Sequence, residues 1–226
     1  MRNVSLTSLL RHLSFTLAGG FFGAYAVLAW GSLASAQTMV LLESVIQGWS
    51  GNGKLAMWYL GAFFIYVTST MLTVLLPHFL HADIRKLCPL IDAAAAVLVA
   101  LFPKTVPVPV ALYPIFFAMA FQWCAFSGAN GYVGSTIFST NNTKQASLSL
   151  AEFLCHGGKA HLRRVHFYLC TLLCFHAGSS VAYFAVSVWD TRASLCCLPL
   201  TLLSYAMVLA EDHMTQNTCM DAPASF

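Results

Sequence analysis

The chain has 226 residues, of which 58% are hydrophobic and only 8% are charged, and its formal net charge is +3. A soluble domain carries about a quarter of its residues as charged side chains, so this composition excludes an ordinary soluble globule. The small positive charge gives no indication of a nucleic-acid partner. We therefore expect a single all-α integral membrane domain over residues 1–226, with the lipid bilayer as its surroundings.

The apolar runs are continuous and about as long as a membrane crossing. A bilayer core roughly 30 Å thick requires about 20 mostly apolar residues of helix, because a helix satisfies its own backbone hydrogen bonds. A transmembrane β-barrel would instead show alternating segments of about ten residues. The sequence predicts about six transmembrane helices, at Leu13–Leu33, Leu55–Leu76, Leu87–Phe102, Val108–Phe126, Val165–Val188 and Ala193–Leu209.

Two arginines, Arg2 and Arg11, precede the first predicted helix. The Ala34–Ala36 segment that follows this helix has the small-x-small form of a signal-peptidase site, so cleavage after Ala36 is an alternative to a retained helix. We favour a retained helix, because its apolar run is longer than a usual signal core and because an even number of helices fits the loop charges.

The loop charges also predict an orientation in a bacterial inner membrane, because short loops rich in Lys and Arg stay on the cytoplasmic side. We expect both termini to be cytoplasmic. The internal cations are then Arg2, Arg11, Arg85, Lys86, Lys144, Lys159, Arg163 and Arg164, and the external cations are Lys54, Lys104 and Arg192.

Two segments interrupt the hydrophobic pattern at membrane depth. The first runs from Gly31 to Glu43, after the first predicted helix, and the second runs from Ser127 to Thr143, after the fourth. A break exposes backbone groups that hydrocarbon cannot satisfy, so it must line a cavity or be buried in protein. The candidate solute-binding residues here are Gln37, Thr38, Thr140, Asn141 and Asn142; the alternative is that the small residues around them only pack helices.

The two breaks occupy matching places in two halves of three helices each, residues 13–103 and 108–211, with a short polar tail at 212–226. A shift of 102 residues places Phe15 on Phe117, for example. Three crossings per half make the first and fourth helices enter the membrane from opposite sides. Such an inverted repeat, with broken segments in both halves, is typical of secondary transporters.

Several segments resemble the YoaK-like family, a widespread group of bacterial membrane proteins of uncharacterised function. The resemblance covers nearly the whole chain and is carried by Gly19–Tyr25, Ala34–Thr38, Phe121–Trp123 and Thr140–Asn142. It implies six membrane helices, an Ala-Gln-Thr-Gly-Asn segment after the first helix and a related Thr-Gly-Asn segment in the second half. Met39 and Val40 stand where the first copy would have Gly and Asn, and Asn141 stands for the second Gly, so the chain is a divergent member. The resemblance implies no reaction.

Three further polar residues near the breaks complete the candidate site: Glu43, Gln122 and Asn130. An ionisable group in a membrane segment usually faces a partner, a cavity or a proton path, although Glu43 could equally end a helix at the external surface. The amides of Gln122 and Asn130 can bind a solute or a neighbouring helix. Glu152 is expected to form an interfacial ion pair with one of the cations Lys144, Lys159, Arg163 and Arg164.

The remaining reactive residues give little sign of catalysis. Asp92 is expected to cap the third predicted helix or to pair with Arg85 or Lys86. His176 lies inside the fifth predicted helix and is the one histidine that we would test as a proton or substrate partner. The eight cysteines form no paired CxxC frame, so we expect free thiols and no metal site. Catalytic and cofactor motifs are missing as well, so neither an enzyme nor a cofactor is predicted.

These features together favour a transporter or permease of a small polar solute. A single copy is small for enclosing a pathway, which makes a homodimer a reasonable arrangement. The second hypothesis is a non-transporting membrane scaffold or accessory protein, in which the same small residues serve only packing. An integral-membrane enzyme comes third, since the sequence names no reaction.

Overall fold

The computed structural model describes the backbone of residues 2–220 and the side chains of residues 6–217. It is helical throughout, except for links, turns and one small hairpin, which confirms the predicted all-α class. The hairpin pairs β1, Gly128–Ala129, with β2, Tyr132–Val133, in an antiparallel register.

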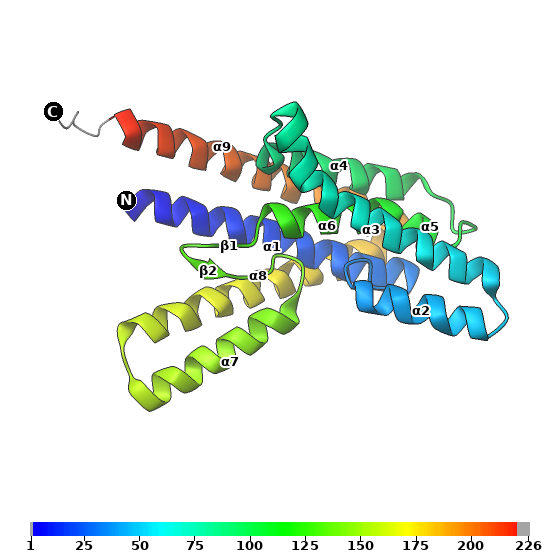
Figure 1. Ribbon diagram of the computed structural model, residues 1–226, viewed down its shortest axis with the longest axis horizontal. Coiled ribbons are helices and arrows are strands. Elements are labelled where there is room, and N and C mark those ends of the chain that lie inside the picture. The colour runs from blue at the N-terminus through cyan, green and yellow to red at the C-terminus, as the bar shows by residue number, and fades with distance from the viewer. Residues whose placement is uncertain (1, 221–226) are drawn as a thin grey trace.

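The helices fall into two groups along the chain (Figure 1). The first group is α1 (Arg2–Trp30), α2 (Gln37–Trp49), α3 (Gly53–Leu80) and α4 (Ile84–Leu101). The second group is α5 (Val108–Ala111), α6 (Tyr113–Ala125), α7 (Ser139–His156), α8 (Lys159–Trp189), the 3-10 helix η1 (Asp190–Cys197) and α9 (Leu198–Met220).

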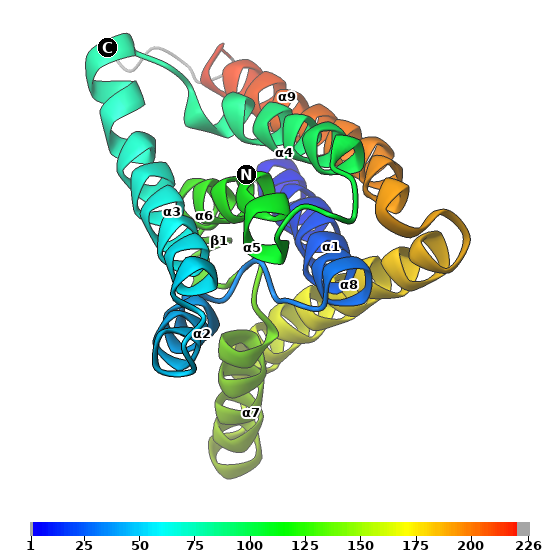
Figure 2. The same cartoon turned by 90° about the vertical axis from the view of Figure 1, so that its right-hand side faces the viewer.

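The helices α1 and α6 form the centre of the bundle, with the long helices around them (Figure 2). On α1, the rings of Phe15, Phe21 and Phe22 are fully buried, and on α6 the side chains from Ala118 to Gln122 are buried without a break. A helix that is apolar all round belongs in such a position, because every face can be covered by a neighbour. This central pair therefore fixes where the other helices lie.

The two central helices have corresponding neighbours. The α1 helix contacts α8 and α9, while α6 contacts α3 and α4. The short helix α2 packs on α3, as α7 packs on α8, and α4 and α9 pack on each other. Counterpart helices run in opposite directions along the long axis, as α1 and α6 show (Figure 1). The start of α1 and the end of α9, which are closest in sequence to the two termini, lie at the same end of the bundle (Figure 1).

Glycines allow α1 and α8 to approach closely. A Cβ added at Gly178 would lie 1.9 Å from the carbonyl oxygen of Leu17, and one added at Gly20 would lie 2.0 Å from the carbonyl oxygen of Phe175. No side chain fits at such distances, so both positions require glycine at the present helix separation. The Ser179 hydroxyl donates to the carbonyl of Gly20 at 3.1 Å across the same contact.

Both predicted breaks are shorter than expected. After α1, only residues 31–36 are non-helical; Gly31 ends the helix with a positive φ of 73°, and α2 begins at Gln37. After α6, the chain is irregular or in the hairpin up to Phe138, and α7 begins at Ser139. The reason is tertiary, because α3 and α8 supply a packing surface for the two short helices.

Other boundaries also differ from the expected ones. The predicted fourth helix is divided at Leu112 into α5 and α6, with a proline in the first turn of α6. The predicted sixth helix starts at Leu198, because residues 190–197 form η1. The expected polar tail is helical up to Met220, and residues 221–226 lie outside the described chain.

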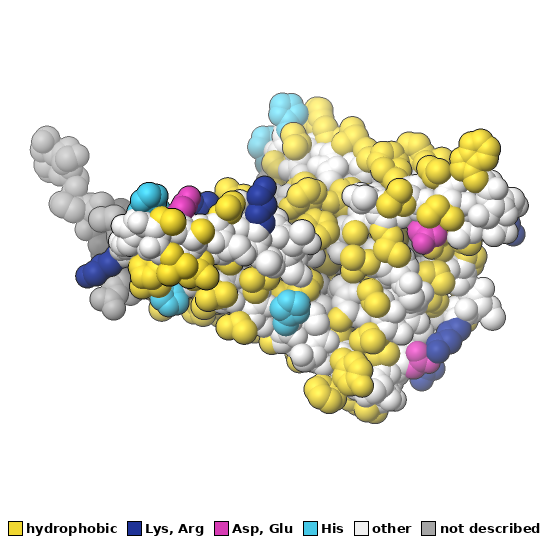
Figure 3. All heavy atoms as spheres, turned by 90° about the horizontal axis from the view of Figure 1, so that it is seen from below, with side chains coloured by type: hydrophobic (Ala, Val, Ile, Leu, Met, Phe, Trp, Pro, Cys, Tyr) yellow, Lys and Arg dark blue, Asp and Glu magenta, His cyan; other side chains and the backbone are white. Residues whose placement is uncertain are grey.

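Helices of membrane-spanning length and composition are present within the described chain. The candidate spans are Leu6–Trp30, Gly53–Leu80 and Lys159–Asn217, and the last of these contains α8, η1 and α9. Phe64, Leu173 and Phe184 are each more than half exposed on the outer surface. Figure 3 shows hydrophobic side chains over much of one face, with few charged ones among them. Such a surface suits lipid and indicates a membrane protein.

Candidate functional site

The two breaks line the same cavity. In an inverted repeat, a binding site between the broken segments has this arrangement. Leu33 and Ser35 line it from the first break, and residues 137–140 line it from the second break and the start of α7. The α1 and α8 helices form its other walls, and its volume is about 460 Å³. Segments about one hundred residues apart in the sequence are therefore neighbours in space.

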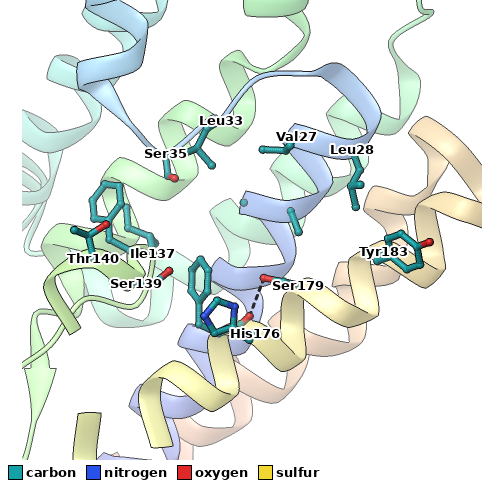
Figure 4. Close-up of a pocket in the computed structure, with 14 residues that line it drawn as sticks. Val27, Leu28, Leu33, Ser35, Ile137, Ser139, Thr140, His176, Ser179 and Tyr183 are labelled. Atoms are coloured by element: carbon teal, nitrogen blue, oxygen red, sulfur yellow. Dashed lines mark hydrogen bonds between the residues drawn. The ribbon is translucent and has the colours of Figure 1, made fainter. Parts of the chain in front are cut away.

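Apart from Tyr183, whose hydroxyl points away from the other lining residues, four polar side chains in this cavity have no hydrogen-bond partner within the described residues: Ser35, Ser139, Thr140 and His176. Figure 4 shows that Ser35 and His176 approach the cavity from opposite sides. Polar groups that lack a protein partner are satisfied by water or by a ligand. The cavity thus offers three hydroxyls and an imidazole to a molecule that enters it.

The rest of the lining is mainly apolar. Val27, Leu28 and Ile137 contribute aliphatic surface, and Ser179 is already bonded to carbonyls of α1 and α8. Among the described residues, no acidic side chain, lysine or arginine lines the cavity. Such a lining favours an uncharged molecule with a few hydrogen-bonding groups.

Asn142 lies directly behind the cavity, where it holds the second break in place. Its amide nitrogen donates to the carbonyls of Ser135 (2.7 Å) and Phe138 (3.0 Å), and its carbonyl oxygen accepts from the Ser135 N–H (3.0 Å). The side chain is fully buried and fully used. Asn142 therefore positions residues 135–138, and its own amide is not free for a solute.

Gln122 holds the second break against α1 from within the bundle. Its amide nitrogen donates to the carbonyl of Phe15 (3.0 Å) on α1 and to the Thr136 hydroxyl (2.9 Å) in the second break. Its carbonyl oxygen is buried and has no partner among the described residues. Gln122 thus joins α6, α1 and the second break, and it does not line the cavity.

The structure disperses the other residues of the predicted site. Of the eight candidates, only Thr140 lines this cavity. Glu43 lies on α2 beside Gln47, whose amide is 3.4 Å from its carboxylate. Gln37 begins α2 with both amide atoms buried and unpartnered in the described chain, and Thr38 beside it is exposed.

Two other asparagines line separate cavities beside α8. Asn130 is at the hairpin turn, with a positive φ of 55°, in a cavity with Arg163 and His166. Asn141 is exposed in a cavity with Arg164. The predicted amide-rich cluster is therefore not assembled at one place.

Sequence reasoning missed Ser35 and Ser139 but singled out His176. Both serines stand beside predicted site residues, so their position in the breaks was the available signal. Serine is too common at helix contacts for that signal to stand alone. His176 was distinguishable because a histidine within an apolar helix is rare and costly.

The carboxylates outside the cavity have structural partners. Glu152 lies 3.1 Å from the His161 ring and 3.8 Å from Arg164, which agrees with the expected ion pair. Asp92 neither caps α4 nor pairs with Arg85 or Lys86, because Asp83 caps the helix by accepting from the Arg85 N–H. Asp92 is instead fully buried, 3.8 Å from the Cys88 sulfur.

Arg85 and Lys86 pair with the last helix. Glu211 contacts both Arg11 of α1 and Arg85 of α4, and Asp212 contacts Arg85 (3.3 Å) and Lys86 (2.9 Å). These charges lie at the end of the bundle that carries the termini. Among the described residues, no cluster of three or more His, Cys, Asp or Glu side chains could hold a metal ion.

Comparison with known proteins gives one match. The family described as "Protein of unknown function (DUF1275)" matches residues 12–210, which include every element that lines the cavity. This result is consistent with the resemblance to YoaK-like membrane proteins. No curated protein and no solved structure matches the sequence.

Proposed function

The chain belongs to the DUF1275 family, and from that premise we propose that it is a membrane permease for a small uncharged solute, which binds in the cavity between the two breaks. The observation that carries the proposal is the meeting of both breaks at one cavity with four unpartnered polar side chains. Two halves of inverted topology with a site between their broken segments are a recurrent design of secondary transporters.

The packing of the helices supports the inverted arrangement. The α1 helix packs against α8 and α9. Its counterpart α6 packs in the corresponding way against α3 and α4. The proposed crossings are α1, α3, α4, the α5–α6 pair, α8 and α9, so each half contributes three. The short helices α2 and α7 then occupy the place that a discontinuous helix takes in a transporter half.

The lining limits the class of solute. A volume of about 460 Å³ is within the usual range of small-molecule sites, which is roughly 300–1,000 Å³. Three hydroxyls and one imidazole provide donors and acceptors, but no fixed charge compensates an ion. We therefore expect a neutral molecule with both apolar and hydrogen-bonding parts, rather than the strongly polar solute that an amide cluster would have suited.

We also propose that both termini are cytoplasmic. The cations Arg85, Lys86, Lys159, Arg163 and Arg164 lie in segments near the end of the bundle that carries the termini, and short basic segments stay inside. A reporter that is active only in the periplasm should therefore be inactive when fused to the C-terminus. The same reporter placed in the loop beside Lys104 should be active, and the opposite pattern would reverse the orientation.

The binding site is tested with purified protein in detergent and a panel of neutral metabolites. A solute that binds only the folded protein raises the apparent melting temperature. We expect His176→Leu and Ser35→Ala to reduce or remove that shift, because each deletes an unpartnered polar group of the cavity. Flux of the same solute into liposomes that contain the protein then measures transport.

Ser180→Ala is the matched control, because Ser180 follows His176 by one helical turn but its hydroxyl bonds the His176 carbonyl outside the cavity. This variant should bind like the unmodified protein. A hit that survives both cavity substitutions would place the solute elsewhere.

The alternative function is a non-transporting membrane scaffold. Leu148 and Leu154 of α7 and Val45 of α2 are each at least half exposed on helices that pack against a single neighbour, which leaves apolar faces for another protein. A scaffold would show no solute-dependent stabilisation and no flux. Stabilisation by a solute that depends on His176 would favour the permease.

A further inference from the structure

A second cavity, of about 430 Å³, lies between α1, the β1–β2 hairpin and α8. Its polar lining consists of Asn130, Tyr132, Arg163 and His166. Its apolar floor includes Phe167, which is 5% exposed and is held between the rings of His12 (5.1 Å between centroids) and Tyr132 (5.2 Å). The site is therefore preformed by three elements and is separate from the cavity at the breaks.

The basic side chains of this second cavity, Arg163 and His166, are not engaged with other described residues. Arg163 and His166 have no ion pair or hydrogen bond in the part of the chain that the structure describes. Arg164, the next residue, is by contrast bound to Gln145 at 2.8 Å and lies 3.8 Å from Glu152. No carboxylate from residues 6–217, whose side chains the structure describes, lines the cavity. A guanidinium and an imidazole with no acid nearby are suited to an external anion, and phosphate oxygens match the guanidinium geometry.

The surface next to the cavity is apolar. His166, Cys170 and Leu173 follow at helical spacing on one side of α8, and Leu173 is 70% exposed. Seven residues of helix rise about 10 Å, so Leu173 lies about that far from His166 along α8. Because α8 runs away from the end that carries the termini, Arg163 is near the bundle end and Leu173 is deeper (Figure 1).

We propose that this cavity binds the phosphate group of an anionic phospholipid, with the head group at Arg163 and His166 and an acyl chain along Cys170 and Leu173. A free phosphate ion could bind at Arg163 and His166, but it would make no contact with the apolar surface at Cys170 and Leu173. Basic pockets between membrane helices near the cytoplasmic surface bind anionic head groups for the same reason. The solute cavity plays no part in this site.

The test compares phosphatidylglycerol with phosphatidylcholine of the same chain length, added to the full-length protein in a neutral detergent. The melting temperature and the number of bound lipids by native mass spectrometry are the two readouts. Phosphatidylglycerol should bind more tightly, and Arg163→Gln should weaken its binding by about fivefold, the effect of losing one basic group near a membrane surface. Arg163→Lys keeps the charge but not the two-pronged guanidinium geometry, so it should lose less affinity than Arg163→Gln but not bind as tightly as the unmodified protein.

Arg192→Gln is the control, because Arg192 lies in η1, which follows the far end of α8. Without lipid, Arg163→Gln should melt like the unmodified protein, since Arg163 has no partner to lose. Equal binding of both lipids, or an equal loss in Arg192→Gln, would overturn the proposal. Stabilisation by inorganic phosphate at the concentration where the lipid acts would also overturn it, because the head group alone would then be sufficient.

Discussion

Replacing Asn142 by leucine should destabilise the protein by about 3 kcal/mol or more. The substitution removes two buried hydrogen bonds and one partly buried one, and it leaves the N–H and carbonyl of Ser135 without their amide partner. An unsatisfied buried polar group costs roughly 1–3 kcal/mol, and more than one is created here. Chemical or thermal unfolding in detergent, monitored by circular dichroism, would measure the loss.

Asn141→Leu is the natural control for this experiment. Asn141 is the adjacent residue, it is exposed, and its side chain makes no hydrogen bond within the described chain. Its substitution should change the free energy of unfolding by no more than about 0.5 kcal/mol. An Asn142→Leu protein that unfolds like the Asn141→Leu protein would contradict the structural role.

Asn142→Asp separates lost hydrogen bonds from altered packing. The carboxylate has the same shape and can still accept from the Ser135 N–H, but it cannot donate to the carbonyls of Ser135 and Phe138. We therefore expect a destabilisation of the same sign. Asn142→Leu would also disturb residues 135–138, some of which line the cavity. A loss of solute binding in that variant would therefore not distinguish a lost ligand contact from a disturbed cavity.

The sequence was sufficient to predict the helical architecture, because composition and run length are properties of the chain alone. The predicted helix at Leu55–Leu76 corresponds to α3, and the one at Val165–Val188 corresponds to α8. The helices α2 and α7 were not predicted as such. The α2 segment, with 13 residues, is too short for a membrane span, and the α7 segment is too polar. Both are helices that pack on α3 and α8, which the local pattern does not reveal.

The sequence also indicated where the cavity would be, but it gave the wrong weight to individual residues. Both breaks do line one cavity, although Asn142 and Gln122 face inward and bond the backbone. An amide forms the same kind of hydrogen bond with a solute as with a backbone carbonyl, so the partner it has depends on the fold. The hydroxyls of Ser35 and Ser139, which look ordinary in the sequence, are the groups that remain unpartnered.

The acidic residue with the largest structural role is Glu211, which was expected to end the second half of the repeat. Its side chain is 10% exposed and contacts the guanidinium groups of Arg11 and Arg85 at the same oxygen. Arg11 also lies 5.1 Å above the ring of Phe126, next to the second break. Glu211 therefore joins α9 to α1 and α4, that is, the second group of helices to the first.

Glu211→Gln should accordingly lower the free energy of unfolding by about 3 kcal/mol, because it leaves the largely buried guanidinium of Arg11 without its carboxylate partner. Arg85 would keep its contact with Asp212 at 3.3 Å, so the loss is expected to fall mainly on Arg11. Asp190→Asn is the matched control, since Asp190 pairs with Lys104 at a site where both side chains are more than half exposed. Such a pair contributes about 0–1 kcal/mol. Unfolding of both variants in detergent would measure the difference; equal small losses would mean that α1, α4 and α9 are held by apolar packing, with the charges contributing little.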